Sequence, residues 1–126
     1  MGRVTHFEIH ADDPQRAMDF YAALLGWTYE AWGGMEYWLA ATGPDDQPGI
    51  HGAVMRRDAP VEGRGIIGFV CTAEIDDVDD ALARVPGLGG KVVSEKRAVP
   101  GVGWHAYVED TEGNLLGLMQ SDRDAA

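Results

Sequence analysis

Apolar and polar residues alternate with two different periods along this chain, and the two periods predict strands and helices. A strand is expected at about residues 4–10, because Phe7 and Ile9 alternate with polar side chains. A helix should follow, since four apolar residues recur at helical spacing: Ala17, Phe20, Tyr21 and Leu24. An acidic residue before Pro14 is the expected start of this helix, and Gly26 is its expected end.

The second half of the chain predicts the same kinds of element. Its helix carries a matching apolar stripe, made of Val78, Ala81, Leu82 and Val85, and should stop at Pro86. Further strands are predicted at residues 27–32, 36–42, 50–56, 70–75, 91–97, 103–109 and 114–120. Clusters of glycine, proline and acidic residues separate these segments, as is typical of turns. Each half therefore predicts one strand, one helix and three more strands.

An internal duplication relates the two halves. Asp12 matches Asp76 and Ala17 matches Ala81 at an offset of 64 residues, while residues 50–55 match 115–120 at an offset of 65. We therefore expect a single domain with a first module at about residues 1–56, a linker at 57–65 and a second module at about 66–122.

The predicted elements define the fold class. A sheet covered by a helix on one face leaves its other face bare, and two such sheets placed edge to edge would curl into a trough. We expect an α+β fold in which two βαβββ modules form a curled eight-stranded sheet with the helices outside. The trough would be the natural place for a small ligand.

Size and charge narrow the classes of partner. The chain has 126 residues, the size of one domain, and 10 Lys and Arg against 21 Asp and Glu give a net charge of −11. This charge repels phosphate backbones and anionic lipids, so we expect no nucleic-acid partner and no membrane partner. No apolar stretch reaches the roughly 18 residues of a membrane helix. We expect a cytoplasmic protein whose lone Cys71 is an inert thiol buried in a strand.

Several segments resemble the vicinal oxygen chelate superfamily, the group of glyoxalase I, bleomycin-resistance proteins and extradiol dioxygenases. They are ADDPQRAMDFY at residues 11–21, LLGW at 24–27 and DTEGNL at 110–115, with IDDVDDAL at 75–82 and VPGVG at 99–103. The resemblance implies the duplicated βαβββ fold, a small-molecule partner and a homodimer. It does not imply one reaction, because members of the family isomerise, cleave, oxidise or only bind.

The resemblance also implies where a metal would bind. Metal-dependent members use two histidines and two glutamates from the first and last strands of each half, and these positions fall on His6, Gly52, Val70 and Gly117. Only His6 offers a donor atom, and a single imidazole does not hold a divalent ion usefully. We therefore expect no metal and no other cofactor. The alternative is a rearranged site for Zn²⁺, Ni²⁺ or Fe²⁺ in which His6 is one ligand.

Catalysis without a metal would need a general acid or base. The candidates are His6, Glu8, His105 and Tyr107. His6 and Glu8 are the expected catalytic residues, because histidine titrates near neutrality and burial raises the pKa of a glutamate towards it. The expected ligand-binding residues are His6, Glu8, His10, Trp38, His51, His105 and Tyr107. Strand alternation would point His51 away from the trough, because it neighbours the inherited ligand position, unless Gly52 introduces a bulge.

Aromatic residues add to the expected ligand chemistry. Six of them are concentrated on the predicted strands: Trp27, Trp32, Tyr37, Trp38, Trp104 and Tyr107. About half should face the trough as flat walls for an aromatic or heterocyclic ligand, including a cationic, antibiotic-like one. The competing interpretation is that these residues pack in the core or form a dimer contact. The first hypothesis is a metal-independent small-molecule-binding protein, and the alternative is a glyoxalase-like lyase or isomerase, or a dioxygenase relative, with a rearranged His/Glu metal site.

Overall fold

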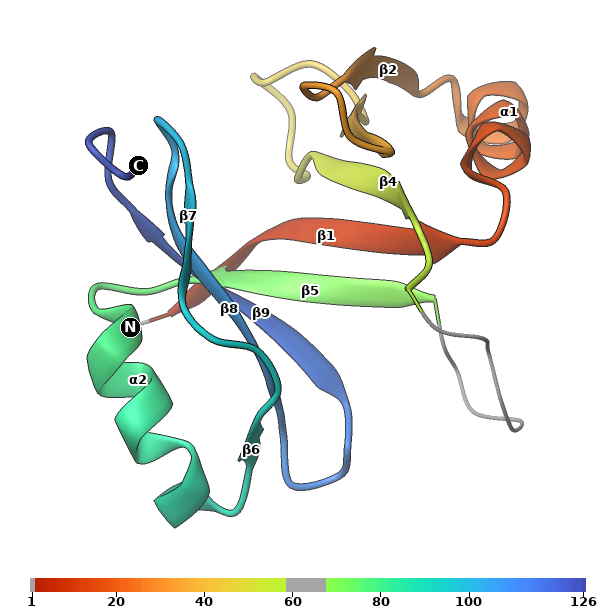
Figure 1. Cartoon of the computed structure of the whole chain (residues 1–126). Coiled ribbons are helices and arrows are strands. Elements are labelled where there is room, and N and C mark those ends of the chain that lie inside the picture. Colours follow the sequence, from red (N-terminus) through yellow and green to blue (C-terminus); the bar gives the residue numbers. More distant parts are fainter. Residues whose placement is uncertain (1, 59–67) are drawn as a thin grey trace. The chain divides into compact units, whose positions relative to one another are not determined.

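A computed structural model describes residues 2–58 and 68–126 of the chain, and over these residues it contains nine strands, two α-helices and one short 3-10 helix (Figure 1). The chain divides into two compact units. Module 1 is the described part of His6–Val70, and module 2 is residues 2–5 together with Cys71–Ala126. Apart from Arg57 and Asp58, the expected linker lies outside the described residues. Neither described helix is long and apolar enough to cross a membrane.

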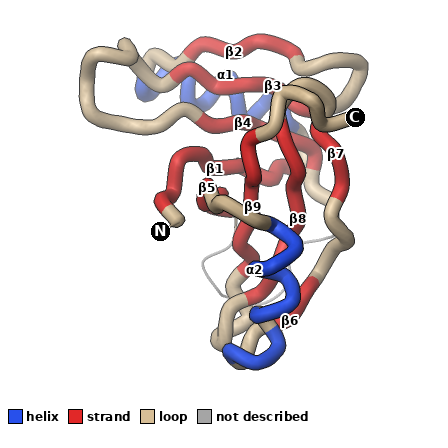
Figure 2. The backbone as a smooth tube through the Cα atoms, turned by 90° about the vertical axis from the view of Figure 1, so that its left-hand side faces the viewer, coloured by secondary structure: helices blue, strands red, loops and turns tan. Residues whose placement is uncertain are grey.

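Module 1 is a four-stranded sheet with one helix. Its elements are β1 (Arg3–Ala11, whose first residues belong to module 2), α1 (Pro14–Leu25), β2 (Thr28–Ala31), β3 (Tyr37–Ala41) and β4 (Gly52–Arg56). The strand order is β2-β3-β4-β1. β1 and β4 run parallel, and the other pairs are antiparallel. α1 packs on one face of this sheet (Figure 2).

The ends of α1 follow the sequence signals. The Asp13 side chain accepts a hydrogen bond from the Arg16 amide, Pro14 occupies the first turn, and Gly26 ends the helix with a φ of 76°. Both boundary predictions are confirmed.

The apolar stripe predicted for α1 is displaced by one turn. Met18 is only 4% exposed, whereas Phe20 and Leu24 are 58% and 65% exposed. The inward residues have the predicted spacing but start at Pro14, which is itself buried: Pro14, Ala17, Met18 and Tyr21. Ala17, Met18 and Tyr21 pack in one core cluster with Phe7, Ile9 and Val54 of the sheet.

Module 2 contains one strand more than predicted. Its elements are β5 (Phe69–Glu74), α2 (Val78–Arg84), the 3-10 helix η1 (Pro86–Leu88), β6 (Lys91–Val92), β7 (Arg97–Val99), β8 (Gly103–Glu109) and β9 (Leu115–Ser121). The strand order is β5-β9-β8-β6, and β7 also pairs with β8. The strand expected at 91–97 is split into β6 and β7, because the regular pairing with β8 is interrupted at Tyr107. The amides of Val93 and Ser94 both donate to the Tyr107 carbonyl, and the Ser94 hydroxyl accepts a hydrogen bond from the Tyr107 amide.

The core of module 2 confirms the stripe predicted for α2, since Val78 is fully buried and the three other predicted residues pack against Ala73, Val108 and Leu118. α2 runs beside β8 and β9 (Figure 2).

The prediction that Cys71 is buried is wrong. Val70 and Thr72 are the buried residues of this part of β5, so alternation turns Cys71 to the exposed side. The predicted α+β class and the strand-helix-strand order of both modules are confirmed.

Candidate functional site

The candidate site lies on the face of the module 1 sheet opposite α1, which we call the helix-free face. Phe7 and Ile9 of β1 pack in the core beneath α1. Successive side chains of a strand alternate between faces, so His6, Glu8 and His10 point to the helix-free face. The structure thus brings these three predicted site residues together.

Strand register places a row of four side chains across this face. Glu8 pairs with Ala53, Ala53 lies opposite Leu39, and Leu39 lies opposite Glu30. The row therefore has a carboxylate on each outer strand, β1 and β2, and two apolar side chains between them. Glu8 is buried with 5% exposure, whereas Glu30 is exposed.

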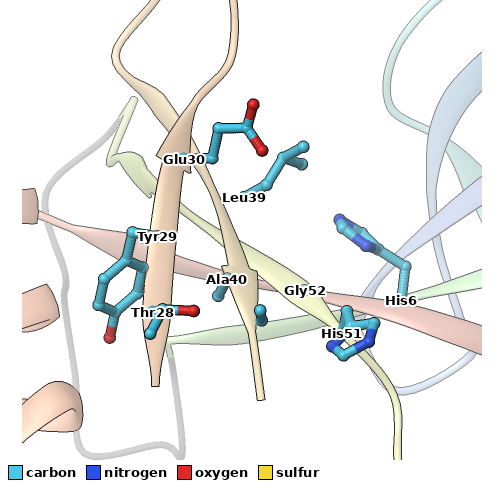
Figure 3. Close-up of a pocket in the computed structure, with 9 residues that line it drawn as sticks. His6, Thr28, Tyr29, Glu30, Leu39, Ala40, His51 and Gly52 are labelled. Carbon is cyan, nitrogen blue, oxygen red and sulfur yellow. The ribbon is translucent and has the colours of Figure 1, made fainter. Parts of the chain in front are cut away.

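A pocket of about 360 Å³ opens on the module 1 sheet. It is lined by His6, Thr28, Tyr29, Glu30, Leu39, Ala40, Ala41, His51 and Gly52. Figure 3 shows Glu30 and Leu39 extending to the same side of their strands, with the His6 ring facing them from β1. The pocket combines an apolar floor with a few polar groups, as small-molecule sites generally do.

Behind the pocket, a chain of hydrogen bonds joins the polar residues of β1. His6 Nε2 lies 3.0 Å from the Tyr37 hydroxyl. That hydroxyl donates to Glu8 Oε2 at 2.9 Å, and His10 Nε2 lies 3.2 Å from Glu8 Oε1. Tyr37 comes from β3, which is separated from β1 by β4. The two expected catalytic residues are therefore connected through a third residue.

The surroundings of His6 change its acid–base behaviour. Burial lowers the pKa of His6 below its ordinary value, because the charged imidazolium loses its solvation, and the nearby Glu8 carboxylate opposes this only in part by raising the pKa. His6 is therefore uncharged at neutral pH. An uncharged imidazole at the edge of a pocket can accept a proton, the first requirement of a general base.

His51 shares the face of His6, contrary to the expectation that it points away. Phe7 pairs with Gly52, so one residue earlier His6 and His51 occupy matching positions on the helix-free face. The Nδ1 atom of His51 accepts from the Thr42 amide at 3.1 Å, and Nε2 lies 2.7 Å from Asp45 Oδ1. Both ring nitrogens thus hold the loop between β3 and β4.

Trp27 and Trp38 do not form the aromatic walls that were expected. Trp38 lies opposite Val54 and packs in the core cluster beneath α1, away from the face of His6. Trp27 stacks on Tyr21 with ring centroids 5.0 Å apart and also packs in that core. Core packing is the interpretation that these contacts favour.

The other two predicted residues, His105 and Tyr107, lie on β8 of module 2. Their rings meet edge to face with centroids 4.5 Å apart, and His105 is 6% exposed. Strand pairing places Tyr107 beside Gly117, and Gly117 beside Thr72. Within the described residues the buried Thr72 hydroxyl has no hydrogen-bond partner. Neither predicted residue lines the pocket of module 1.

Sequence reasoning missed Glu30 and Leu39 as site residues and did not single out Tyr37 from the other aromatic residues. Their separation from His6 is 24 to 33 positions, and only strand register brings them to one face. The alternation of β3 carried a partial signal, because Tyr37 and Leu39 have the same parity and Trp38 has the opposite one.

A family model described as the Glyoxalase/Bleomycin resistance protein/Dioxygenase superfamily matches residues 3–118. The chain belongs to this superfamily. Among curated relatives, the "Putative glyoxylase CFP32" of Mycobacterium tuberculosis is 28% identical over 116 residues, which cover 90% of this chain and 42% of the relative. The chain thus spans less than half the length of the relative it matches.

Solved structures of the superfamily share the fold. A superfamily member from Vibrio splendidus 12B01 has a TM-score of 0.66 at 15% identity, covering 96% of this chain and all of the other (100%). Methylmalonyl-CoA epimerase from Mycobacterium tuberculosis has a TM-score of 0.62 at 18% identity, covering 94% of this chain and 87% of the other. At these identities the likeness concerns the fold alone.

The structure corrects which residues of the two modules correspond at the superfamily's metal positions. Gly117 pairs with Thr72, and Thr72 lies 64 residues after Glu8, which pairs with Ala53. Ala53, and not Gly52, is therefore the counterpart of Gly117, and Gly52 faces the core. The offset of 65 inferred for this segment is wrong, and the offset of 64 extends to the last strand of each module.

The residues present do not fit the metal of the superfamily. A Cβ atom at Gly117 would lie 2.6 Å from Thr72 Oγ1 and 3.1 Å from His105 Nε2, so a glutamate side chain has no room there. Ala53 and Val70 carry no donor atom, and His6 Nε2 is engaged by Tyr37. Among the described residues, no three His, Cys, Asp or Glu side chains are grouped so that they could hold a metal ion.

Proposed function

We propose that this chain is a metal-independent member of the superfamily that binds a small heterocyclic or aromatic molecule in the pocket of module 1. The observation that carries this proposal is the pocket itself, in which His6 meets an apolar floor of Leu39 and Ala41. The floor suits a flat apolar body, and the polar groups would fix its orientation. A homodimer, expected from the resemblance, is part of the proposal.

The charges around the pocket favour an uncharged or cationic ligand. No lysine or arginine is among its described lining residues, whereas Glu30 is, and the whole chain carries a net charge of −11. Phosphate groups would be repelled by this surface. We therefore do not extend to this chain the coenzyme A thioester named for the epimerase of similar fold.

A second candidate function is a lyase or isomerase that transfers a proton without a metal. The hydrogen-bond chain from His6 through Tyr37 to Glu8 favours it, because an uncharged histidine held by a carboxylate through an intermediate residue is a suitable general base. The reaction class would be proton removal next to a carbonyl group, with His6 as the acceptor.

Three measurements test these proposals. Titration of ¹⁵N-labelled protein with 2-aminopyridine should shift amide signals of β2, β3 and β4 around the pocket, and the absence of such shifts would contradict binding there. Elemental analysis of protein purified without added metal should find far less than one divalent ion per chain. A stoichiometric ion that is lost in His6→Ala would overturn metal independence. For the second candidate, turnover of the methylglyoxal–glutathione hemithioacetal should resist a chelator and disappear in His6→Ala.

A further inference from the structure

The hydrogen-bond chain behind the pocket determines which nitrogen of His6 carries the proton. A carboxylate can only accept, so the Tyr37 hydroxyl donates its single hydrogen to Glu8. The Tyr37 oxygen must then accept from His6, and His6 Nε2 must be the donor over their 3.0 Å separation. His10 donates to the second oxygen of Glu8 and holds that carboxylate in place.

The other nitrogen of His6 is therefore an acceptor. Because burial lowers its pKa, His6 carries one ring proton at neutral pH, and with that proton on Nε2 the lone pair is on Nδ1. Within residues 2–58 and 68–126, Nδ1 has no hydrogen-bond partner in the protein. Because the His6 ring lines the pocket, a molecule bound there could donate a hydrogen bond to this lone pair.

Glu30 supplies a second acceptor on the opposite side of the pocket. It extends from β2, one outer strand of the module 1 sheet, while His6 extends from β1, the other (Figure 3). Among the described residues its carboxylate makes no ion pair and no hydrogen bond. Leu39 and Ala41 lie between the two acceptors.

We infer that the pocket recognises a flat, nitrogen-bearing hydrogen-bond donor, such as an amidine or an amino-substituted heterocycle, between His6 Nδ1 and Glu30. Tyr37 and Glu8 are positioning residues that hold His6 in the accepting tautomer. The inference rests on the proposed binding function and names its ligand class. A ligand of the same shape that carries a carboxylate in place of the donor group would face two hydrogen-bond acceptors, His6 Nδ1 and the Glu30 carboxylate, and should not bind.

The first experiment measures the tautomer directly. Long-range ¹H–¹⁵N correlation spectra of histidine-labelled protein should show His6 with its proton on Nε2. Tyr37→Phe should release this preference and move the His6 ring nitrogen shifts towards a mixture of tautomers. His51 is an internal control, because the Thr42 amide fixes its Nδ1 as an acceptor independently of Tyr37. A His6 tautomer that is unchanged in Tyr37→Phe would overturn the positioning role.

The second experiment compares benzamidine with benzoate, two flat probes of similar shape and opposite hydrogen-bonding character. Benzamidine should shift the pocket amides and benzoate should not. Glu30→Gln should weaken benzamidine binding about tenfold, the loss expected for one charge-assisted contact. Glu36→Gln is the matched control, because it removes the same charge from a carboxylate that pairs with Arg56 and is not among the pocket residues.

The outcomes separate the inference from the function on which it rests. Benzoate bound in the pocket as tightly as benzamidine, or equal losses in Glu30→Gln and Glu36→Gln, would overturn the donor-selective pocket and leave small-molecule binding intact. If benzamidine, benzoate and 2-aminopyridine all left the pocket amides unshifted, both the inference and the proposed function would fail.

Discussion

Tyr37 links the two acid–base residues of β1. Glu8 turns one carboxylate oxygen to His10, two positions along the strand, and the other to the Tyr37 hydroxyl. The Tyr37 hydroxyl lies between His6 and Glu8, 3.0 Å from His6 Nε2 and 2.9 Å from Glu8 Oε2. A tyrosine from another strand thereby joins the side chains of His6 and Glu8 in one hydrogen-bonded chain.

The lowered pKa of His6 predicts a pH dependence of stability. The unfolded chain binds a proton at His6 near the ordinary value of 6.5, whereas the folded protein binds it only at lower pH. The unfolded state therefore holds more protons in the window just below that value, and the free energy of unfolding should fall as the pH falls from about 7 to 5. Urea unfolding of the wild type and of His6→Gln across this range should show a shallower slope for His6→Gln.

Glu8→Gln provides the complementary variant for this prediction. The Glu8 carboxylate raises the pKa of His6, so its removal should lower that pKa further, and a titration of the His6 ring signals by NMR measures the change. A His6 pKa that rises in Glu8→Gln, or a wild-type slope equal to that of His6→Gln, would contradict the electrostatic account.

At the scale of elements, β1 and β4 meet through an unusual pair. Gly52 lies opposite Phe7 in the parallel register, and a Cβ atom at Gly52 would come within 2.6 Å of three atoms of the Phe7 ring. The ring therefore occupies the space that any side chain at Gly52 would need. Phe7 directly follows His6 and Gly52 directly follows His51, so this pair lies next to the two histidines.

Replacing Gly52 should consequently cost stability. We expect Gly52→Ala to lower the free energy of unfolding by about 1–3 kcal/mol, the usual cost of overpacking a core. Gly34→Ala is the matched control, because nothing lies within 4 Å of its added Cβ, and it should change stability by no more than about 0.5 kcal/mol. Phe7→Leu in the Gly52→Ala background should recover part of the loss in urea unfolding. Equal stabilities of Gly52→Ala and Gly34→Ala would show that the ring moves aside freely.

The sequence predicted the elements better than it predicted their faces. Caps and turn residues placed both helices within a residue or two, because these signals are local. The inward face of α1 was displaced by one turn, because several overlapping apolar stripes fit one helix and only packing selects among them. The pairing of β4 with β1 determines that His51 points to the helix-free face and Gly52 to the core. A local sequence pattern cannot predict this register, because it depends on two strands that are far apart in the chain.

At the scale of the whole molecule, the two duplicated modules carry different chemical groups at corresponding positions. The positions 64 residues after His6 and Glu8 are Val70 and Thr72, so module 2 lacks the imidazole and the carboxylate that module 1 carries on its first strand. The correct correspondence of Ala53 with Gly117 followed from register and could not be obtained from a short sequence match. The histidine and glutamate of the first strand therefore have no counterparts in the second module, whose His105 and Tyr107 lie instead on β8.

The net charge of the molecule should act on any ligand that the pocket selects. With 21 acidic against 10 basic residues, the chain attracts a cation over a range that shrinks as salt is added, from about 30 Å at 0.01 M to about 3 Å at 1 M ionic strength. The affinity for benzamidine should therefore fall as sodium chloride is raised, mainly through a slower association. The uncharged analogue benzamide, which keeps the flat ring and an amide donor, should bind with little dependence on salt. Equal salt dependence for the two probes in calorimetric titrations would show that the acidic surface has no part in recognition.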